Sequence, residues 1–203
     1  MRPTLLRGWP LFCITNLMNA KRLIIISAVL AMFFSACATK LPFDASLPII
    51  RISEADKSDI QQFGSDFTVN PYMEPVTMLR GKLYEFFIVK VSFNLSLDSQ
   101  IAITAKAVSP DGKEVAKVYD QYTFAEFWDA NTSGESNLGA KITRKTSSIS
   151  RSCIPAFEFF QRAGQSEMFI PLVSKNPIPR PAIITIEVVP STGSTVTYTY
   201  NLE

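Results

Sequence analysis

Alternation of apolar and polar residues with a period of two most constrains how this chain of 203 residues can fold. Segment 196–202 alternates Val, Tyr, Tyr and Leu with threonine and asparagine, and segment 182–188 shows the same period. A longer alternation runs over 83–97, where the first half is apolar on both faces. Because successive side chains of a strand point to opposite faces, these segments predict strands that rest on a core.

Turn residues separate further segments of the same kind. Pro110-Asp111-Gly112 lies between the apolar segments 101–108 and 114–122, which predicts a β-hairpin. Segment 168–173 predicts another strand. A short helix is expected over 54–63, because capping residues precede it and a glycine follows it.

Seven or eight strands with turns between them, and no repeated helical segments, favour an all-β fold. We expect one domain over 48–203, built as an antiparallel β-sandwich. In length and hairpin content it resembles the immunoglobulin-like and fibronectin-like modules of bacterial envelope proteins. A lipocalin-like barrel is the alternative.

The N-terminal region carries a targeting pattern. Lys21-Arg22 precedes an apolar run over 23–34, and Ser35-Ala36 follows it directly before Cys37. A spanning helix needs about 20 apolar residues, whereas this run has 12. A positive region, a short apolar region and small residues at a cut site are typical of a secretory signal.

With a cysteine directly after the small residues, the segment resembles a bacterial lipoprotein signal, although Phe34 stands where that family usually has leucine. The resemblance implies removal of residues 1–36 and a diacylglycerol and an N-acyl chain (such as palmitate) on Cys37. Met18 is the expected true start. Residues 37–47 would then form a tether of roughly 30 Å if extended. An uncleaved anchor and plain secretion are the competing interpretations.

The expected cleavage before Cys37 changes the net charge of the chain, and the residue after Cys37 bears on its location. The chain has 20 basic and 18 acidic residues, but four basic residues and no acidic residue precede Cys37. The mature chain would carry a net charge of −2, which gives no reason to expect a nucleic-acid partner. In the lipoprotein family, a residue such as Ala38 after the cysteine implies the outer membrane, with periplasmic or surface orientation left open.

The residue inventory limits catalytic chemistry. The chain has no histidine and three cysteines, so histidine-assisted nucleophiles and histidine-ligated zinc are excluded. With Cys37 acylated, Cys153 would be the one thiol of the mature chain, and we expect it to be buried. Carboxylates remain, as in Asp56 with Asp59 or Asp120 with Glu126. Solvated surface charge explains them more simply, and we expect no cofactor or metal.

A segment rich in serine, threonine and glycine over 129–152 is the candidate contact surface, together with the aromatic residues before it. A solvated loop and core packing are the competing explanations. The candidate residues are Lys141, Arg144, Lys145, Arg151, Tyr122, Phe127 and Trp128.

The sequence thus favours a non-catalytic, lipid-anchored binding or structural module that contacts an envelope protein, lipid or glycan. An envelope hydrolase that uses paired carboxylates is one alternative. A carrier of an apolar ligand is another. The proline-rich segment 176–181 is expected to be a rigid crossover between sheets.

Overall fold

The computed structural model describes residues 40–132 and 152–203. Two helices of this part are α2 (Lys57–Phe63) and α3 (Gln121–Thr132). Its strands are β1 (Ile50–Glu54), β2 (Thr77–Leu79), β3 (Lys82–Leu95), β4 (Ser99–Val108), β5 (Glu114–Val118), β6 (Glu158–Gln161), β7 (Gly164–Lys175), β8 (Ala182–Pro190) and β9 (Val196–Leu202).

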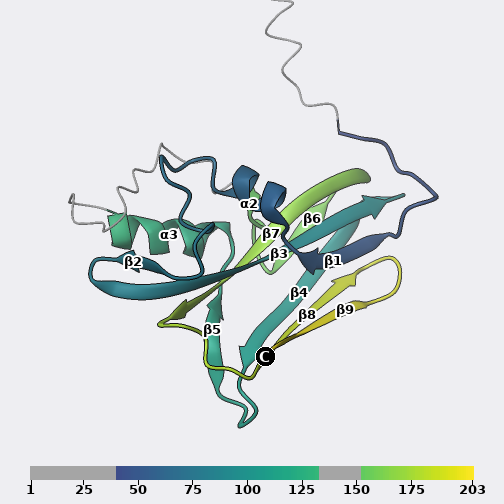
Figure 1. The fold of residues 1–203 in the computed structure, drawn as a ribbon. Helices are drawn as coiled ribbons and strands as arrows, with labels where there is room; N and C mark the ends of the chain where they lie inside the picture. Colours follow the sequence, from purple (N-terminus) through teal and green to yellow (C-terminus); the bar gives the residue numbers. More distant parts are fainter. Residues whose placement is uncertain (1–39, 133–151) are drawn as a thin grey trace, which may run out of the picture. The chain divides into compact units, whose positions relative to one another are not determined.

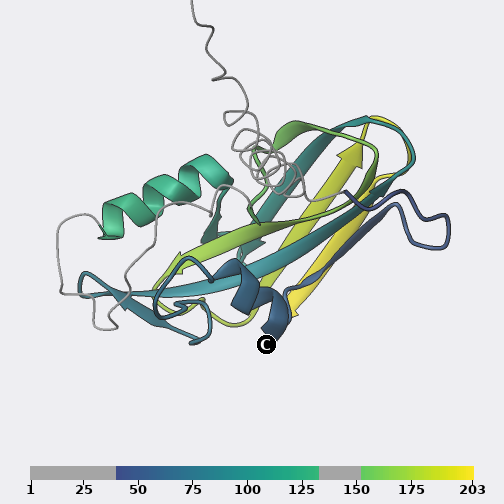
Figure 2. The ribbon, with the colours of Figure 1, turned by 90° about the horizontal axis from the view of Figure 1, so that it is seen from above.

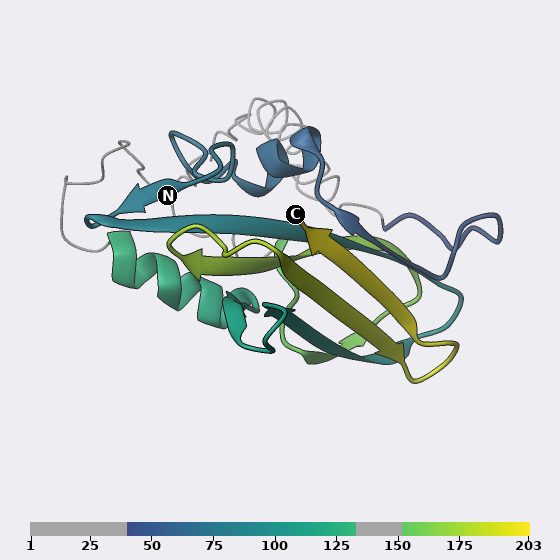
Figure 3. The ribbon, with the colours of Figure 1, turned by 60° about the horizontal axis from the view of Figure 1, so that its bottom comes forward.

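The described strands form one antiparallel sheet in the order β1-β3-β7-β5-β4-β8-β9, with β2 beside β3 and β6 beside β4 (Figure 1). The sheet folds over on itself, so that β8 and β9 lie across from β3 and β7 (Figure 3). Its end strands β1 and β9 come close to each other. The all-β, antiparallel prediction is confirmed. The sheet is nearly closed, which matches the barrel alternative and does not single out an immunoglobulin-like sandwich.

The main core lies between the two halves of this sheet. Alternate residues of β3, including Val89, Val91 and Phe93, point inward and pack with Ile184 and Ile186 of β8. The alternation seen in the sequence therefore marks which side chains enter this core. The interior is filled by the side chains themselves, since these five are at most 1% exposed.

The outer face of β3 and β7 carries a second core. Helices α2 and α3 and the segment 64–76 cover it, as the view from above shows (Figure 2). Ile88, Phe86 and Tyr84 of β3 pack there, which confirms that the first half of this strand is covered on both faces. The region beside α3 is therefore helix on sheet rather than sheet on sheet.

The hairpin of β4 and β5 is confirmed, but its second strand is shorter than expected. We predicted a strand over 114–122, whereas β5 ends at Val118 and α3 begins at Gln121. The carboxylate of Asp120 accepts hydrogen bonds from the backbone N–H groups of Tyr122 and Thr123, at 2.9 Å each. This cap starts a helix where apolar content alone had indicated a strand.

The structure also bears on the predictions for the short helix and for the proline-rich segment. Helix α2 lies inside the predicted range 54–63, with Asp56 as its N-cap and Gly64 as its C-cap. The proline-rich segment 176–181 leads from β7 in one half of the sheet to β8 in the other, so it crosses between two halves of one sheet and not between two sheets as predicted. Glu85, which interrupts the apolar face of β3, accepts a hydrogen bond from the backbone of Ile178 at 2.6 Å and pairs with Arg180.

Candidate functional site

Helix α3 brings most of the candidate aromatic side chains into one place. Phe124 and Trp128 are fully buried in the outer core, where the ring of Trp128 packs against Phe67 and Phe86. Their spacing of four residues puts them on one face of the helix. The sequence contained this signal, because Asp120 is a capping residue and 124, 127 and 128 are at helical spacing.

The three aromatic candidates from the sequence therefore have different environments. Trp128 is a core residue, and its indole Nε1 has no hydrogen-bond partner within 40–132 and 152–203. Phe127 is half-buried at the edge of the outer core. Tyr122 is exposed on the first turn of α3. Of the three, Phe127 lies where a partner could reach an aromatic ring supported by the fold.

The remaining candidates lie outside the described residues. These are the basic residues Lys141, Arg144, Lys145 and Arg151, and the predicted lipidation site Cys37. The roles assigned to them stay predictions.

A groove of about 530 Å³ opens beside α3, next to Phe127. It lies where β5 separates from β7. These strands pair at Lys117 with Val173 and at Val118 with Leu172, whereas β5 begins at Glu114 and β7 continues to Lys175. The parts of β5 and β7 that do not pair with each other form two of its walls, and β3 and α3 contribute the others. Its lining residues are Tyr84, Glu114, Val115, Ala116, Lys117, Tyr119, Phe127, Val173, Ser174 and Lys175.

Three aromatic rings form the apolar part of this groove. The ring of Phe127 lies edge-to-face with Tyr84 at 5.3 Å and tilted against Tyr119 at 5.6 Å. The Lys117 ammonium lies 4.8 Å from the centre of the Tyr119 ring, within the range of a cation–π contact. Burial, and then the neighbouring Tyr84, raise the pKa of the Tyr119 phenol above its ordinary value. This hydroxyl therefore stays a neutral hydrogen-bond donor at physiological pH.

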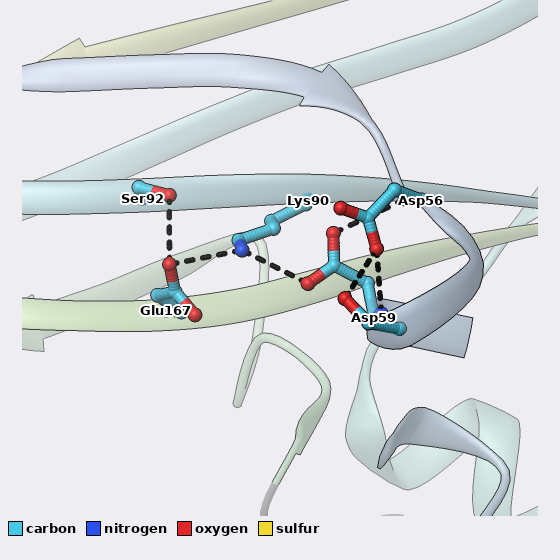
Figure 4. A network of polar contacts seen from close by, with 6 residues as sticks. Asp56, Asp59, Lys90, Ser92 and Glu167 are labelled. Atoms are coloured by element: carbon cyan, nitrogen blue, oxygen red, sulfur yellow. Dashed lines mark hydrogen bonds and ion pairs between the residues drawn. The ribbon is translucent and has the colours of Figure 1, made fainter. Parts of the chain in front are cut away.

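A polar network binds α2 to the outer face of the sheet (Figure 4). The ammonium of Lys90 lies 2.9 Å from Asp59 Oδ1 and 3.0 Å from Glu167 Oε1. Burial by itself lowers the pKa of Lys90, but the hydrogen bonds and charges of these two carboxylates outweigh burial and raise the pKa. Lys90 thus holds the helix against β3 and β7 as a charged residue.

The carboxylates considered for catalysis have structural contacts. Asp56 and Asp59 each accept a hydrogen bond from the other's backbone N–H group, at 2.9 and 3.1 Å, which is a capping box. Asp59 also pairs with Lys90, and Asp120 caps α3. Three of the four named carboxylates are therefore engaged in holding helices.

Cys153 is buried beside β7, where its backbone pairs with that of Phe169 as an isolated parallel β-bridge. Burial, and then the charge of Asp120, raise the pKa of its thiol far above the ordinary value. The thiol is thus in its protonated, unreactive form. In the described ranges, no three His, Cys, Asp or Glu side chains come together as metal ligands, and no helix has the length and apolar character needed to cross a membrane.

The described residues thus define an all-β protein with a filled interior and an open aromatic groove. No family model and no curated protein matches the chain. Among solved structures, a FixG-related protein from Vibrio parahaemolyticus is similar over 76% of this chain and 95% of that chain, with 9% identity and a TM-score of 0.33. A likeness of this strength carries no argument about fold or function.

Proposed function

We propose that this protein is a lipid-anchored, non-catalytic module of the bacterial envelope that binds an envelope partner through the groove beside α3. Acylation of Cys37 would hold it at the outer membrane, as the signal-like segment before Cys37 suggests. The partner would be a protein or a glycan.

The aromatic groove is the observation that carries this proposal. Tyr84, Tyr119 and Phe127 offer ring faces and edges to a ligand, and the exposed Lys117 and Lys175 offer positive charge. Glu114 is the one acidic residue of the lining, so the groove favours a ligand with an apolar or ring-shaped part and an anionic group. Such a combination is common in binding sites, where a few polar groups orient a ligand over an apolar surface.

For the architecture, we propose a sheet that is intermediate between the sandwich and the barrel of our expectations. Two facing halves with a filled core support a sandwich. The pairing of β5 with both β4 and β7, and the nearness of β1 and β9, support a barrel.

The alternative functions find less support in the geometry. A carrier of an apolar ligand needs open space inside the sheet, whereas inward side chains of β3 and β8 have essentially no exposed area. A carboxylate hydrolase needs two free carboxyl groups across a cleft, whereas Asp56, Asp59 and Asp120 accept backbone hydrogen bonds.

Photo-cross-linking in intact cells tests the binding surface. A photo-reactive residue at Lys117 is expected to trap an envelope partner that is recovered through a tag after Glu203. The same residue at Lys57, which is exposed on α2 and outside the groove, is the matched control. Equal recovery at both positions would contradict the groove as a binding site.

Fatty-acid labelling tests the anchor separately. We expect the wild-type chain to incorporate labelled palmitate and the Cys37→Ala variant to incorporate none. Equal labelling of the two chains would end the lipid-anchor proposal.

A further inference from the structure

Residues 40–47, which were expected to be part of a tether, are bonded to the domain. The backbone N–H of Gln165 donates to the carbonyl of Leu41 at 2.8 Å, and its side chain donates to the carbonyl of Pro42 at 2.8 Å. The buried side chain of Asn94 accepts from the N–H of Asp44 and donates to the carbonyls of Asp44 and Leu47. We call residues 40–47 the clasp segment.

Gly164 shows how closely the clasp segment fits. A Cβ atom at this position would lie 2.7 Å from the carbonyl oxygen of Leu41, which is closer than such contacts occur. Gly164 also has a φ of +101°, a conformation that other residues rarely adopt. Both the space and the backbone therefore require glycine where the clasp segment crosses the start of β7.

The bonded clasp segment leaves little chain between the domain and the proposed anchor. Three peptide links separate Cys37 from Lys40, and a fully extended chain spans at most about 3.6 Å per residue. Lys40 can thus lie no more than about 11 Å from the acylated cysteine. The expected spacer of roughly 30 Å is not available while the clasp segment is bonded.

The surface around Lys40 combines exposed apolar side chains with positive charge. Leu41 and Leu97 are 63% and 66% exposed, and Phe43 is exposed as well. The side chain of Lys40 donates to the carbonyl of Arg162, which places both cations at this end. Two acids lie nearby: Asp44, within the clasp segment itself, and Asp98, whose carboxylate accepts from the N–H of Ala163 at 2.7 Å. We call this surface, with Lys40, Leu41, Phe43, Leu97 and Arg162, the clasp rim.

We propose that the clasp rim lies against the lipid bilayer and that the short link to Cys37 holds the domain in this orientation. The inference rests on the proposed acylation of Cys37. Leucine and phenylalanine side chains suit the boundary between headgroups and acyl chains, and Lys40 and Arg162 suit anionic headgroups. Lysine and arginine are both accommodated there because their stems are apolar.

This orientation directs the aromatic groove away from the membrane. The clasp rim adjoins Leu95 at the end of β3, whereas Tyr84 of the groove lies near the start of that strand. Eleven residues of an extended strand span roughly 36 Å. In all three ribbon views the clasp segment and β2 lie at opposite ends of the sheet (Figures 1, 2 and 3). The groove is thereby presented to partners beyond the lipid surface.

Depth-dependent fluorescence quenching tests the orientation. The acylated chain is reconstituted in vesicles of phosphatidylethanolamine and phosphatidylglycerol, with a fluorophore on Leu97→Cys or, as the matched control, on Met78→Cys. Met78 is an apolar residue that is 50% exposed and pairs with the far end of β3. We expect a quencher attached to the lipid to act at least three times more strongly at 97 than at 78. The chain without an introduced cysteine is treated with the same fluorophore, and its signal measures any labelling of the buried Cys153.

Two further measurements separate this inference from the anchor on which it rests. Flotation with the vesicles shows whether the chain is anchored in lipid. A chain that does not float would contradict both the lipid anchor and the proposed orientation. A chain that floats but shows equal quenching at 97 and 78 would overturn the orientation alone. Insertion of twenty Gly and Ser residues after Thr39 should keep flotation and weaken quenching at 97 at least twofold. Unchanged quenching would contradict the part assigned to the short link.

Discussion

Asn94 is buried on the outer face of β3, although asparagine is usually exposed. Its side chain is only tolerated there because the clasp segment satisfies it, through contacts of 2.7, 2.9 and 3.1 Å. Asn94 thus holds the second half of the clasp segment to the domain, while Gln165 holds the first half.

Substitution of Asn94 by alanine should release the clasp segment between Asp44 and Leu47. We expect the free energy of unfolding to fall by about 1–3 kcal/mol, the usual cost of leaving buried polar groups without partners. Urea denaturation measures this loss. Ser96→Ala, an exposed change just after the end of β3, should alter stability by less than about 0.5 kcal/mol. Equal effects of the two substitutions would mean that Asn94 does not hold the segment.

Lys90 predicts a pH dependence of stability. Its pKa is raised in the folded chain, so its contribution is fully present below the unfolded value of about 10.4 and is lost as pH rises through the folded pKa. We expect Lys90→Met to be less stable than wild type at about pH 8.5, with the difference shrinking by about pH 11.5. Urea denaturation at both values measures it.

Lys90→Arg is the matched control for this prediction. Arginine keeps its charge over the whole range, so this variant should retain its ion pairs with Asp59 and Glu167 at about pH 11.5. If wild type and Lys90→Met differed in stability by the same amount at both pH values, the stabilising role assigned to the charge of Lys90 would be contradicted.

Cys153 should be inert to thiol reagents in the folded protein. Burial raises the pKa of its thiol and also blocks access to it. In a chain with Cys13→Ala and Cys37→Ala, we expect no reaction with a colorimetric disulfide reagent under native conditions and one thiol per chain in guanidinium chloride. Rapid native reaction would show that the segment around Cys153 opens.

At the scale of elements, α3 depends on its contact with the outer core. Phe124 is fully buried and contacts the rings of Phe63, Tyr119 and Trp128, among others. Phe124→Ala should lower the free energy of unfolding by about 3–5 kcal/mol, because a buried ring is replaced by a cavity. Tyr122→Ala, on the exposed side of the same helix, should cost less than about 0.5 kcal/mol. Guanidinium denaturation of both variants measures the contrast.

The elements differ in how much of them the sequence predicts. Strands β8 and β9 alternate strictly, because one of their faces packs on the core, and they were predicted almost to the residue. Strands β1, β2 and β6 were missed, since three to five residues carry too little of any period. Helix α3 was missed because its buried face is aromatic, and aromatic residues also favour strands.

At the scale of the whole molecule, β5 is the link between the two halves of the sheet. It pairs with β7 at two positions and with β4 at two positions, whereas β3 and β7 pair at eleven. We expect amides of β5 to exchange with deuterium faster than those of β3 and β7, because fewer hydrogen bonds must open together. Exchange followed by mass spectrometry measures this order. Slower exchange in β5 would show that the link is not the weakest part of the sheet.

The groove could not be predicted from the sequence, although Phe127, one of its lining residues, was among the candidates. Its walls come from β3, β5, β7 and α3, which are far apart in the chain. It exists because two strands stop pairing at Lys117 and Val173, and pairing between strands is not encoded by any local pattern. The sequence indicated residue types suited to binding, and the fold decides which of them share a surface.

The clasp segment also determines what a cut between the domain and the proposed anchor would release. A protease that cleaves between Ala38 and Thr39 would shed the domain with the bonds of Asn94 and Gln165 intact, because those bonds begin at Leu41. A fragment that starts at Pro48 would lose all of them. Release from the proposed anchor would therefore need no unfolding, and a fragment for ligand screening should begin at or before Lys40.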